Sequence, residues 1–349
     1  MVKKSKKPQA LQYIGIFVGI VFIFSFWLAY TVFFKPAISI PQGSETYLFA
    51  IPTGSTLSEA TQKLSDEIHF ESSIGFTFLS KIVSLEQHVY PGLYKLSSGM
   101  SNKDLVLLFR SGKRETVDVT IRFGRYADDI VRAVAPKIEA DYNEMLELIS
   151  NQEFLDSLGF SKETAICLFL PDTYECKWNT SAKGFLLRMH KEFKTYWNDE
   201  RISKAHEMGF SPQQIMTIAS IVNQETNKID EKPRVAGVYI NRLKQNMPLQ
   251  ADPTVKYAIG DFSLKRIYKG HLLVNSPYNT YRNNGLPPGP ICTPQKADIE
   301  AVLNHESHAY IFFCARPDYS GYHNFAKSYD EHLRFARMYS SWLDSEQIK

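Results

Sequence analysis

Glu225 is the residue of this chain that is best placed for acid–base chemistry. It lies seven residues after Ile218 and three after Val222, so on a helix it falls on or beside their apolar face. An unpaired carboxylate is costly to bury, so a glutamate at this position is either paired or functional. Lys228, three residues further on, is its candidate local partner. Desolvation raises the pKa of a carboxyl group, which lets it keep a proton for donation to a leaving group.

The residues around Glu225 predict two helices and a loop. Ser211 is a suitable N-cap, and Pro212 suits the first helical position, where a missing N–H costs nothing. After a polar break, Pro233 starts a second amphipathic segment. Its apolar side is formed by Val235, Val238, Tyr239 and Leu243. Residues 249–254 (LQADPT) are too rich in turn-forming residues to continue a helix, so they predict a polar loop.

Several motifs in this region resemble those of one known family. In order between Ala219 and Ile291 the chain has ASIVNQET, VYINRL, LQADPTVKY, SPYNTY and GLPPGPI. With these motifs the chain resembles the YceG-like endolytic murein transglycosylases, and weaker similarity extends over most of the region outside the N-terminal apolar segment. Many members of the family have a second acidic residue where this chain has Asn223. Glu225 is therefore the only carboxylate in its motif.

The resemblance implies lytic cleavage of nascent peptidoglycan strands by one carboxylate. Glu225 would protonate the oxygen between N-acetylmuramic acid and N-acetylglucosamine and then take the proton of the muramic C6 hydroxyl. The product would be a 1,6-anhydro end, and cleavage would terminate strand elongation. Ordinary glycosidases use a second carboxylate. Asp252 is the nearest candidate, so a hydrolytic muramidase that uses Glu225 and Asp252 is the alternative.

The resemblance also supplies candidate substrate-binding residues, which are polar or aromatic side chains able to contact sugars. They are Asn241, Gln250, Asp252, Thr254, Tyr257, Asn279, Tyr281 and His323. By residue type alone, loop and helix-end structure is favoured for Asn241, Gln250, Asn279 and Tyr281, and Tyr257 also suits a core. For His323, which matches an H-x-F element of the family, a structural or substrate-positioning role is favoured over catalysis. The chain has neither a CxxC motif nor a Cys/His cluster at zinc spacing, so we expect no metal and no cofactor.

An apolar segment at the N-terminus predicts a membrane anchor. Residues 8–34 include no charged residue, and residues 13–34 are almost wholly apolar, which is long enough for a transmembrane helix. Lysines at positions 3, 4, 6 and 7 favour a cytoplasmic tail over residues 1–12, with everything after Lys35 outside. A cleaved signal peptide would have a shorter apolar core and small residues at a cleavage site. We therefore expect a single-pass membrane protein, and the resemblance implies that the membrane is the bacterial inner membrane, with the catalytic domain in the periplasm.

The remaining sequence predicts two domains of a mixed α+β fold. Residues 35–44 suit a linker, and residues 45–115 have the order strand, helix, helix, strand, which resembles the LysM-like module of the family. Such a module either binds glycan or serves as a spacer. Residues 116–349 form the YceG-like catalytic domain, in which the turn-forming core of CLFLPDTYEC is Pro171–Tyr174. Further helices are expected over 127–134, 142–150 and 182–197, with a buried strand over 311–314 and a final helix from about Ser328.

The charge of the chain bears on its possible partners, and its cysteines bear on possible disulfides. The net charge is +3, and the four N-terminal lysines account for +4 of it, which leaves −1 for the rest. The chain therefore lacks a basic field for nucleic acid. Cys167 and Cys176 are close enough for a disulfide, but small buried thiols are equally plausible. A third function remains open, that of a non-enzymatic wall-binding scaffold, and the resemblance suggests the peptidoglycan synthesis machinery as a partner.

Overall fold

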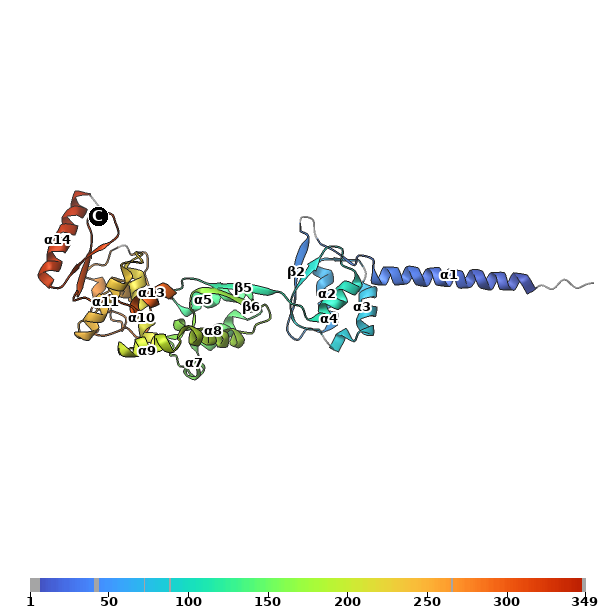
Figure 1. Ribbon diagram of the computed structural model, residues 1–349, viewed down its shortest axis with the longest axis horizontal. Helices are drawn as coiled ribbons and strands as arrows, with labels where there is room; N and C mark the ends of the chain where they lie inside the picture. The colour runs from blue at the N-terminus through green and yellow to red at the C-terminus, as the bar shows by residue number, and fades with distance from the viewer. Residues whose placement is uncertain (1–6, 41–43, 72, 88, 265, 347–349) are drawn as a thin grey trace, which may run out of the picture. The chain divides into compact units, whose positions relative to one another are not determined.

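The computed structural model describes residues 7–40, 44–71, 73–87, 89–264 and 266–346 (Figure 1). The chain divides into two compact units, one formed by Met1–Val117 with Glu175–Thr180 and the other by Asp118–Tyr174 with Ser181–Lys349. Helices and two-stranded sheets occur in both units. The mixed α+β class predicted from the sequence is therefore confirmed.

The N-terminal apolar segment is one continuous helix, α1 (Lys7–Phe33). Its apolar part, Leu11–Phe33, has a mean hydropathy of 2.3, and none of its most apolar stretch is buried in the protein. A helix of 23 residues extends over about 34 Å, against about 30 Å for the hydrocarbon core of a bilayer. By length and composition α1 can cross a membrane.

The rest of the first unit surrounds one apolar core, which includes Phe49, Phe76, Tyr94 and Phe109. Two of its helices begin with capping boxes at Thr56 and Ser101, whose side chains accept hydrogen bonds from the third helical N–H. Antiparallel pairing of β2 with β4 forms its main sheet. The elements are β2 (Thr46–Ile51), α2 (Leu57–Glu67), α3 (Ser73–Ile82), η1 (Leu85–Gln87), β4 (Gly92–Ser97) and α4 (Asn102–Ser111).

Part of the expected linker belongs to this core. Within residues 35–44, β1 (Ile38–Ser39) pairs antiparallel with β3 (His69–Phe70). Ala37 and Ile38 are 1% and 2% exposed. Burial of these apolar side chains removes them from water and lowers the free energy of the folded domain. Residues 37–39 are therefore packed into the domain and are not a free linker.

A second correction concerns the segment predicted as a turn around Pro171–Tyr174. Here β6 (Asp172–Lys177) pairs with β5 (Thr116–Ile121). Tyr174 and Cys176 alternate as buried residues, which is the period of a strand and was hidden by the turn-forming Pro-Asp pair. None of the four cysteines forms a disulfide in the part of the chain that the structure describes, and Cys167, Cys176 and Cys292 are buried. They serve as small apolar residues.

The second unit is mainly helical. The helices predicted over 127–134, 142–150 and 182–197 are present as α5, α6 and α8, and α7 and α9 were not predicted. This part consists of α5 (Ala127–Val134), η2 (Ala135–Lys137), α6 (Tyr142–Ser150), α7 (Gln152–Leu158), η3 (Ala165–Leu168), α8 (Ala182–Tyr196) and α9 (Asp199–Glu207). It continues with α10 (Pro212–Glu225), α11 (Lys232–Lys244), α12 (Asp252–Ile259), η4 (His271–Leu273) and α13 (Lys296–Leu303).

The helix α10 is the centre of this unit, and both α11 and α13 pack against it. Ser211 caps it, as expected, and every residue from Ile215 to Val222 is buried. The predicted loop over 249–254 is only half right, because Asp252 already begins α12, with Pro253 in its first turn. Proline at that position is compatible with a helix start, so the turn-forming composition marked the beginning of a helix.

The C-terminal part is a hairpin followed by a long helix. It consists of β7 (Phe312–Ala315), β8 (His323–Ala326) and α14 (Tyr329–Ser345), with α14 against both strands (Figure 1). Ser328 caps α14 at the position predicted from the sequence. The strand β7 is half-buried along its whole length, whereas the sequence predicted a buried strand. A two-stranded sheet covered on one side by one helix leaves such a strand partly exposed.

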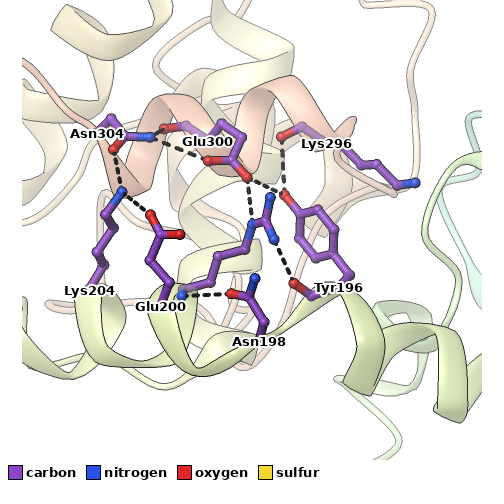
Figure 2. A network of polar contacts seen from close by, with 8 residues as sticks. Tyr196, Asn198, Glu200, Lys204, Lys296, Glu300 and Asn304 are labelled. Carbon is purple, nitrogen blue, oxygen red and sulfur yellow. Dashed lines mark hydrogen bonds and ion pairs between the residues drawn. The ribbon is translucent and has the colours of Figure 1, made fainter.

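Polar contacts connect α9 to α13 (Figure 2). The Arg201 guanidinium donates to the Glu300 carboxylate at 2.6 Å, and the Tyr196 hydroxyl donates to the same oxygen at 3.1 Å. Lys204 donates to the Asn304 side chain at 3.1 Å and pairs with Glu200 at 3.0 Å. These groups are partly exposed, so the network orients α13 more than it stabilises the fold.

A buried ion pair holds α10, α11 and α13 together. Asp298 on α13 is fully buried, and one of its carboxylate oxygens accepts from the Lys232 ammonium of α11 at 2.5 Å. The other oxygen accepts from the Asn223 amide of α10 at 2.7 Å and from the backbone N–H of Gln295 at 2.7 Å. Each oxygen of the buried carboxylate thus has a partner, and the partners belong to different elements.

We predict that Lys232→Met lowers the stability of the second unit by about 3–5 kcal/mol, because it leaves the Asp298 charge buried without its cation. Lys204→Met is the matched control, since it removes a lysine from an exposed pair and should change stability by less than about 1 kcal/mol. Thermal and urea unfolding of the two variants give the comparison. Equal effects of the two substitutions would show that the buried pair does not hold these helices.

Candidate active site

A cavity of about 280 Å³ lies at the C-terminal end of α10. Glu225, Gln250, Asp252 and Tyr281 line it, so four of the residues predicted from the sequence share one site. The other lining residues are Tyr239, Arg242, Leu249, Phe312, Phe313, Tyr329 and His332. The cavity therefore combines two carboxyl groups with polar donors and an aromatic wall.

Glu225 is the last residue of α10, and its partner is Tyr239. The Tyr239 hydroxyl, on a ring that is 2% exposed, donates to the Glu225 carboxyl at 2.6 Å. Lys228, the partner expected from the sequence, instead lies with its ammonium 4.9 Å from the centre of the Tyr322 ring. The helix ends at Glu225, so Lys228 is not its neighbour on a helical turn. The expectation of a local ion pair is wrong for that reason.

The surroundings of Glu225 favour its protonated form. Desolvation by burial is the main cause that raises its pKa to about 7, from an ordinary 4.5, and the negative charge of Asp252 adds to it. The hydrogen bond from Tyr239 and the charges of His323 and Lys256 act in the opposite direction. A carboxyl group with this balance can donate a proton near neutral pH and can also exist as the base.

Asp252 lies at the start of α12, on the same cavity. The Tyr281 hydroxyl donates to the Asp252 carboxylate at 2.6 Å, and this hydrogen bond together with burial raises the pKa of Tyr281. The pair brings one residue of LQADPTVKY into contact with one of SPYNTY. Their exposed edges provide hydrogen-bonding groups beside Glu225.

Arg242 shapes the loop that supplies Gln250, and the sequence did not single it out. Its guanidinium donates to the backbone carbonyls of Leu249 at 2.8 Å and Pro248 at 3.1 Å, and to the Gln250 side chain at 3.3 Å. It also donates to the carbonyl of Ile311 at 2.6 Å. Gln250 has a φ of 53°, a conformation that needs such support in a residue other than glycine. Arg242 thus fixes both the loop and the strand beside the cavity.

Thr254 and Asn279 build the loops behind the cavity. Both are 0% exposed. The Thr254 hydroxyl lies 2.8 Å from that of Thr280, and the Asn279 amide donates to the carbonyls of Leu272 at 2.9 Å and Val274 at 2.8 Å. A side chain without exposed surface cannot reach a sugar. We therefore assign these two residues to loop structure, in place of the substrate contact expected from the sequence.

Three more predicted residues lie off the cavity lining. The Asn241 amide donates to the carbonyls of His308 at 2.8 Å and Tyr310 at 3.0 Å. Tyr257 lines a separate cavity of about 340 Å³, where its ring lies 4.6 Å from that of Tyr278. His323 has its Nδ1 at 2.8 Å from the Glu231 carboxylate and acts on Glu225 through its charge. The structural or substrate-positioning role favoured from the sequence stays a prediction.

The aromatic wall of the cavity comes from the C-terminal hairpin and α14, and the sequence did not indicate it. The rings of Phe312 and His332 stack with centres 5.2 Å apart, and Phe313 meets Tyr239 edge-on at 5.9 Å. Phe312 and His332 lie 87 and 107 positions after Glu225 in the chain. The apolar run over 311–314 predicted a strand, but no local signal indicated which element it faces.

Comparisons with known proteins show the family to which this fold belongs. The sequence model of the YceG-like family matches residues 49–338, so the chain belongs to the YceG-like family. It is 28% identical over 307 residues to an endolytic murein transglycosylase of Bacillus subtilis, covering 83% of this chain and 84% of that protein. It is 26% identical to the endolytic murein transglycosylase of Streptococcus pneumoniae, of which it spans 58%. A crystal structure of a YceG-like protein from Listeria monocytogenes has a TM-score of 0.55 and 28% identity, covering 83% of this chain and 98% of that one.

We predict that Tyr239→Phe raises the pKa of Glu225 further above about 7, because the lost hydrogen bond stabilises the charged form. Carbon-13 NMR titration of glutamate-labelled protein measures the pKa of Glu225. The Glu225→Gln variant identifies the resonance of the Glu225 carboxyl carbon, because that resonance is missing from its spectrum. Tyr281→Phe is the matched control, since it removes a similar hydroxyl that donates to Asp252. An unchanged titration in Tyr239→Phe would contradict the role given to this hydrogen bond.

Proposed function

We propose that this protein is a lytic transglycosylase that cleaves the glycan strands of peptidoglycan, with Glu225 as acid and then base. The observation that carries the proposal is the Glu225 carboxyl group, whose pKa is raised to about 7 in a cavity lined by sugar-compatible groups. Membership of the YceG-like family and the similarity to endolytic murein transglycosylases support it.

In the first step, protonated Glu225 donates its proton to the oxygen between N-acetylmuramic acid and N-acetylglucosamine. The bond from C1 of the muramic residue to that oxygen breaks, and the N-acetylglucosamine end leaves as an alcohol. The negative charge that remains on Glu225 is stabilised by the hydrogen bond from Tyr239. The raised pKa makes the proton available, and the hydrogen bond limits the cost of releasing it.

In the second step, the Glu225 carboxylate takes the proton of the muramic C6 hydroxyl, and O6 forms a bond to C1. This closes the 1,6-anhydro ring and returns Glu225 to its protonated form. Water is not consumed, and one carboxyl group serves both steps. Gln250, Asp252 and Tyr281 supply hydrogen bonds to the sugars, and Phe312 and Tyr329 supply apolar surface on the opposite wall.

The N-terminal helix supports a location for this activity. In the proposal, α1 anchors the chain in the bacterial inner membrane, with residues 1–12 in the cytoplasm and the rest outside. The lysines that precede α1 favour this orientation. An enzyme held at the membrane acts on nascent strands where they are made and terminates their elongation, beside the synthesis machinery. The domain of residues 45–115 is proposed to be LysM-like, either binding glycan or acting as a spacer.

A hydrolytic muramidase is the second candidate, because Asp252 lines the same cavity as Glu225 and raises its pKa. The two reactions give different products. Mass spectrometry after digestion of purified uncross-linked glycan with the full chain should show 1,6-anhydro ends. Reducing ends that incorporate labelled oxygen from water would remove the lytic assignment and support the muramidase. The absence of any cleavage would leave the wall-binding scaffold.

We predict that Glu225→Gln lowers the cleavage rate by at least about 10²-fold, because amide nitrogen cannot replace the acid. Its stability at pH 8 should be equal or higher by about 1 kcal/mol, because an ionised, poorly solvated carboxylate is removed. The folded-state pKa is raised, so the wild type loses stability as pH rises from 4.5 to about 7, and the variant does not.

Asp252→Asn is the control for the comparison of Glu225→Gln with the wild type. On the one-carboxylate mechanism it weakens substrate positioning, so KM rises while turnover at saturating glycan persists. If Asp252→Asn is folded and as inactive as Glu225→Gln, two carboxylates are needed and the muramidase mechanism gains.

We also predict that kcat/KM decreases on the alkaline side of its pH profile. The value of kcat/KM reports the free enzyme, so it should fall as pH rises through about 7, by about tenfold per unit beyond it, as Glu225 loses its proton. Assays on soluble glycan strands between about pH 5 and pH 9 measure it. Tyr239→Phe should shift this decrease to higher pH, and a decrease at the same pH in both proteins would assign it to another group.

A further inference from the structure

The helix α3 of the first unit has apolar residues on two opposite faces. Phe76 and Leu79 are 1% and 5% exposed and belong to the core. On the other face Ile74, Phe78 and Ile82 are 82%, 55% and 61% exposed. They are spaced by four residues, so they form one stripe along the helix. A stripe of large apolar side chains is unfavourable in water and marks a surface that binds something apolar.

This stripe adjoins the helix α1. A groove of about 360 Å³ is lined by Ile74, Gly75 and Phe78 of α3 and by residues of α1. The α1 residues are Ser25, Leu28, Ala29, Val32 and Phe33. A Cβ atom on Gly75 would lie 3.6 Å from the Val32 Cα and 2.5 Å from the Asn102 side chain, so the glycine permits the close approach. The end of α1 meets α3 in the first unit (Figure 1).

The contact places the stripe at a definite depth. The apolar part of α1 ends at Phe33, and Ser25 lies about 12 Å before it along the helix axis. The α3 residues that share the groove with Ser25–Phe33 therefore lie beside the last two turns of the apolar span. In a membrane this level contains the acyl chains nearest the headgroups, where amphipathic helices insert their apolar faces by about 5–10 Å.

We propose that Ile74, Phe78 and Ile82 insert into the leaflet in which α1 ends, so that α3 lies in the membrane surface as a second contact with lipid. The exposed Lys81 lies beside the stripe, and the Lys103 ammonium lies 5.9 Å from the ring of Phe34, just past α1. Both suit the phosphate groups of phospholipids. The first unit is thus held against the bilayer and is not tethered at a distance from it. The inference rests on the proposed anchoring by α1.

The test uses the full chain reconstituted in nanodiscs of phosphatidylethanolamine and phosphatidylglycerol. The photo-reactive residue p-benzoylphenylalanine replaces Phe78 or, in separate proteins, Ile82, Leu48 or Phe22. Leu48 is the matched control, because it is an apolar residue of the same domain with 56% exposure that does not line the groove. Phe22, 75% exposed in the middle of α1, reports insertion of the anchor.

We expect lipid adducts at positions 78 and 82 at a level about tenfold above position 48, together with strong labelling at position 22. Labelling at position 22 with only the background level at 78 and 82 would overturn the inference and leave the anchor intact. A protein–protein adduct at 78 would also overturn it, because the stripe would then bind a second copy. Loss of labelling at position 22 would remove both the anchor and the inference, whereas cleavage of soluble glycan by the same preparation tests the enzyme separately.

Discussion

The buried carboxylate of Asp298 is the constraint on which the site depends. A charge without exposed surface must have a partner for each oxygen, and the partners come from the elements that support the chemistry. Asn223 lies two residues before Glu225 on α10, and Lys232 lies two turns before Tyr239 on α11. Holding these two side chains on one carboxylate sets how α10 and α11 meet, and thereby brings the Tyr239 hydroxyl to Glu225.

The same constraint accounts for the asparagine at position 223. The Asn223 amide donates to Asp298 at 2.7 Å. An ionised carboxylate at this position would face Asp298 without a proton to share, and like charges at such a distance repel. The asparagine is therefore matched to Asp298, and Glu225 remains the only carboxyl group of its motif that lines the cavity.

The end of a helix is a physically suitable place for an acid that must also act as a base. The C-terminal end of α10 carries partial negative charge, which disfavours an ionised Glu225. Burial and Asp252 act in the same direction, while Tyr239, His323 and Lys256 favour the charged form. These opposed effects leave the pKa of Glu225 at about 7, where each protonation state is accessible at little cost.

Local signals in the sequence predicted several of the helices and singled out Glu225 as the candidate acid. The Ser211 cap and the apolar run of α1 are each contained in one continuous stretch of the chain, and the structure confirms both as parts of helices. Only the tertiary structure decided which groups meet. The partner of Glu225 is Tyr239 and not Lys228. Thr254 and Asn279 are buried in the loops behind the cavity. Residues of β7 and α14 form one wall of the cavity. The physical reason is that capping and periodicity act within one or two turns, whereas a partner such as Asp298 lies 75 residues from Asn223 and is selected by packing.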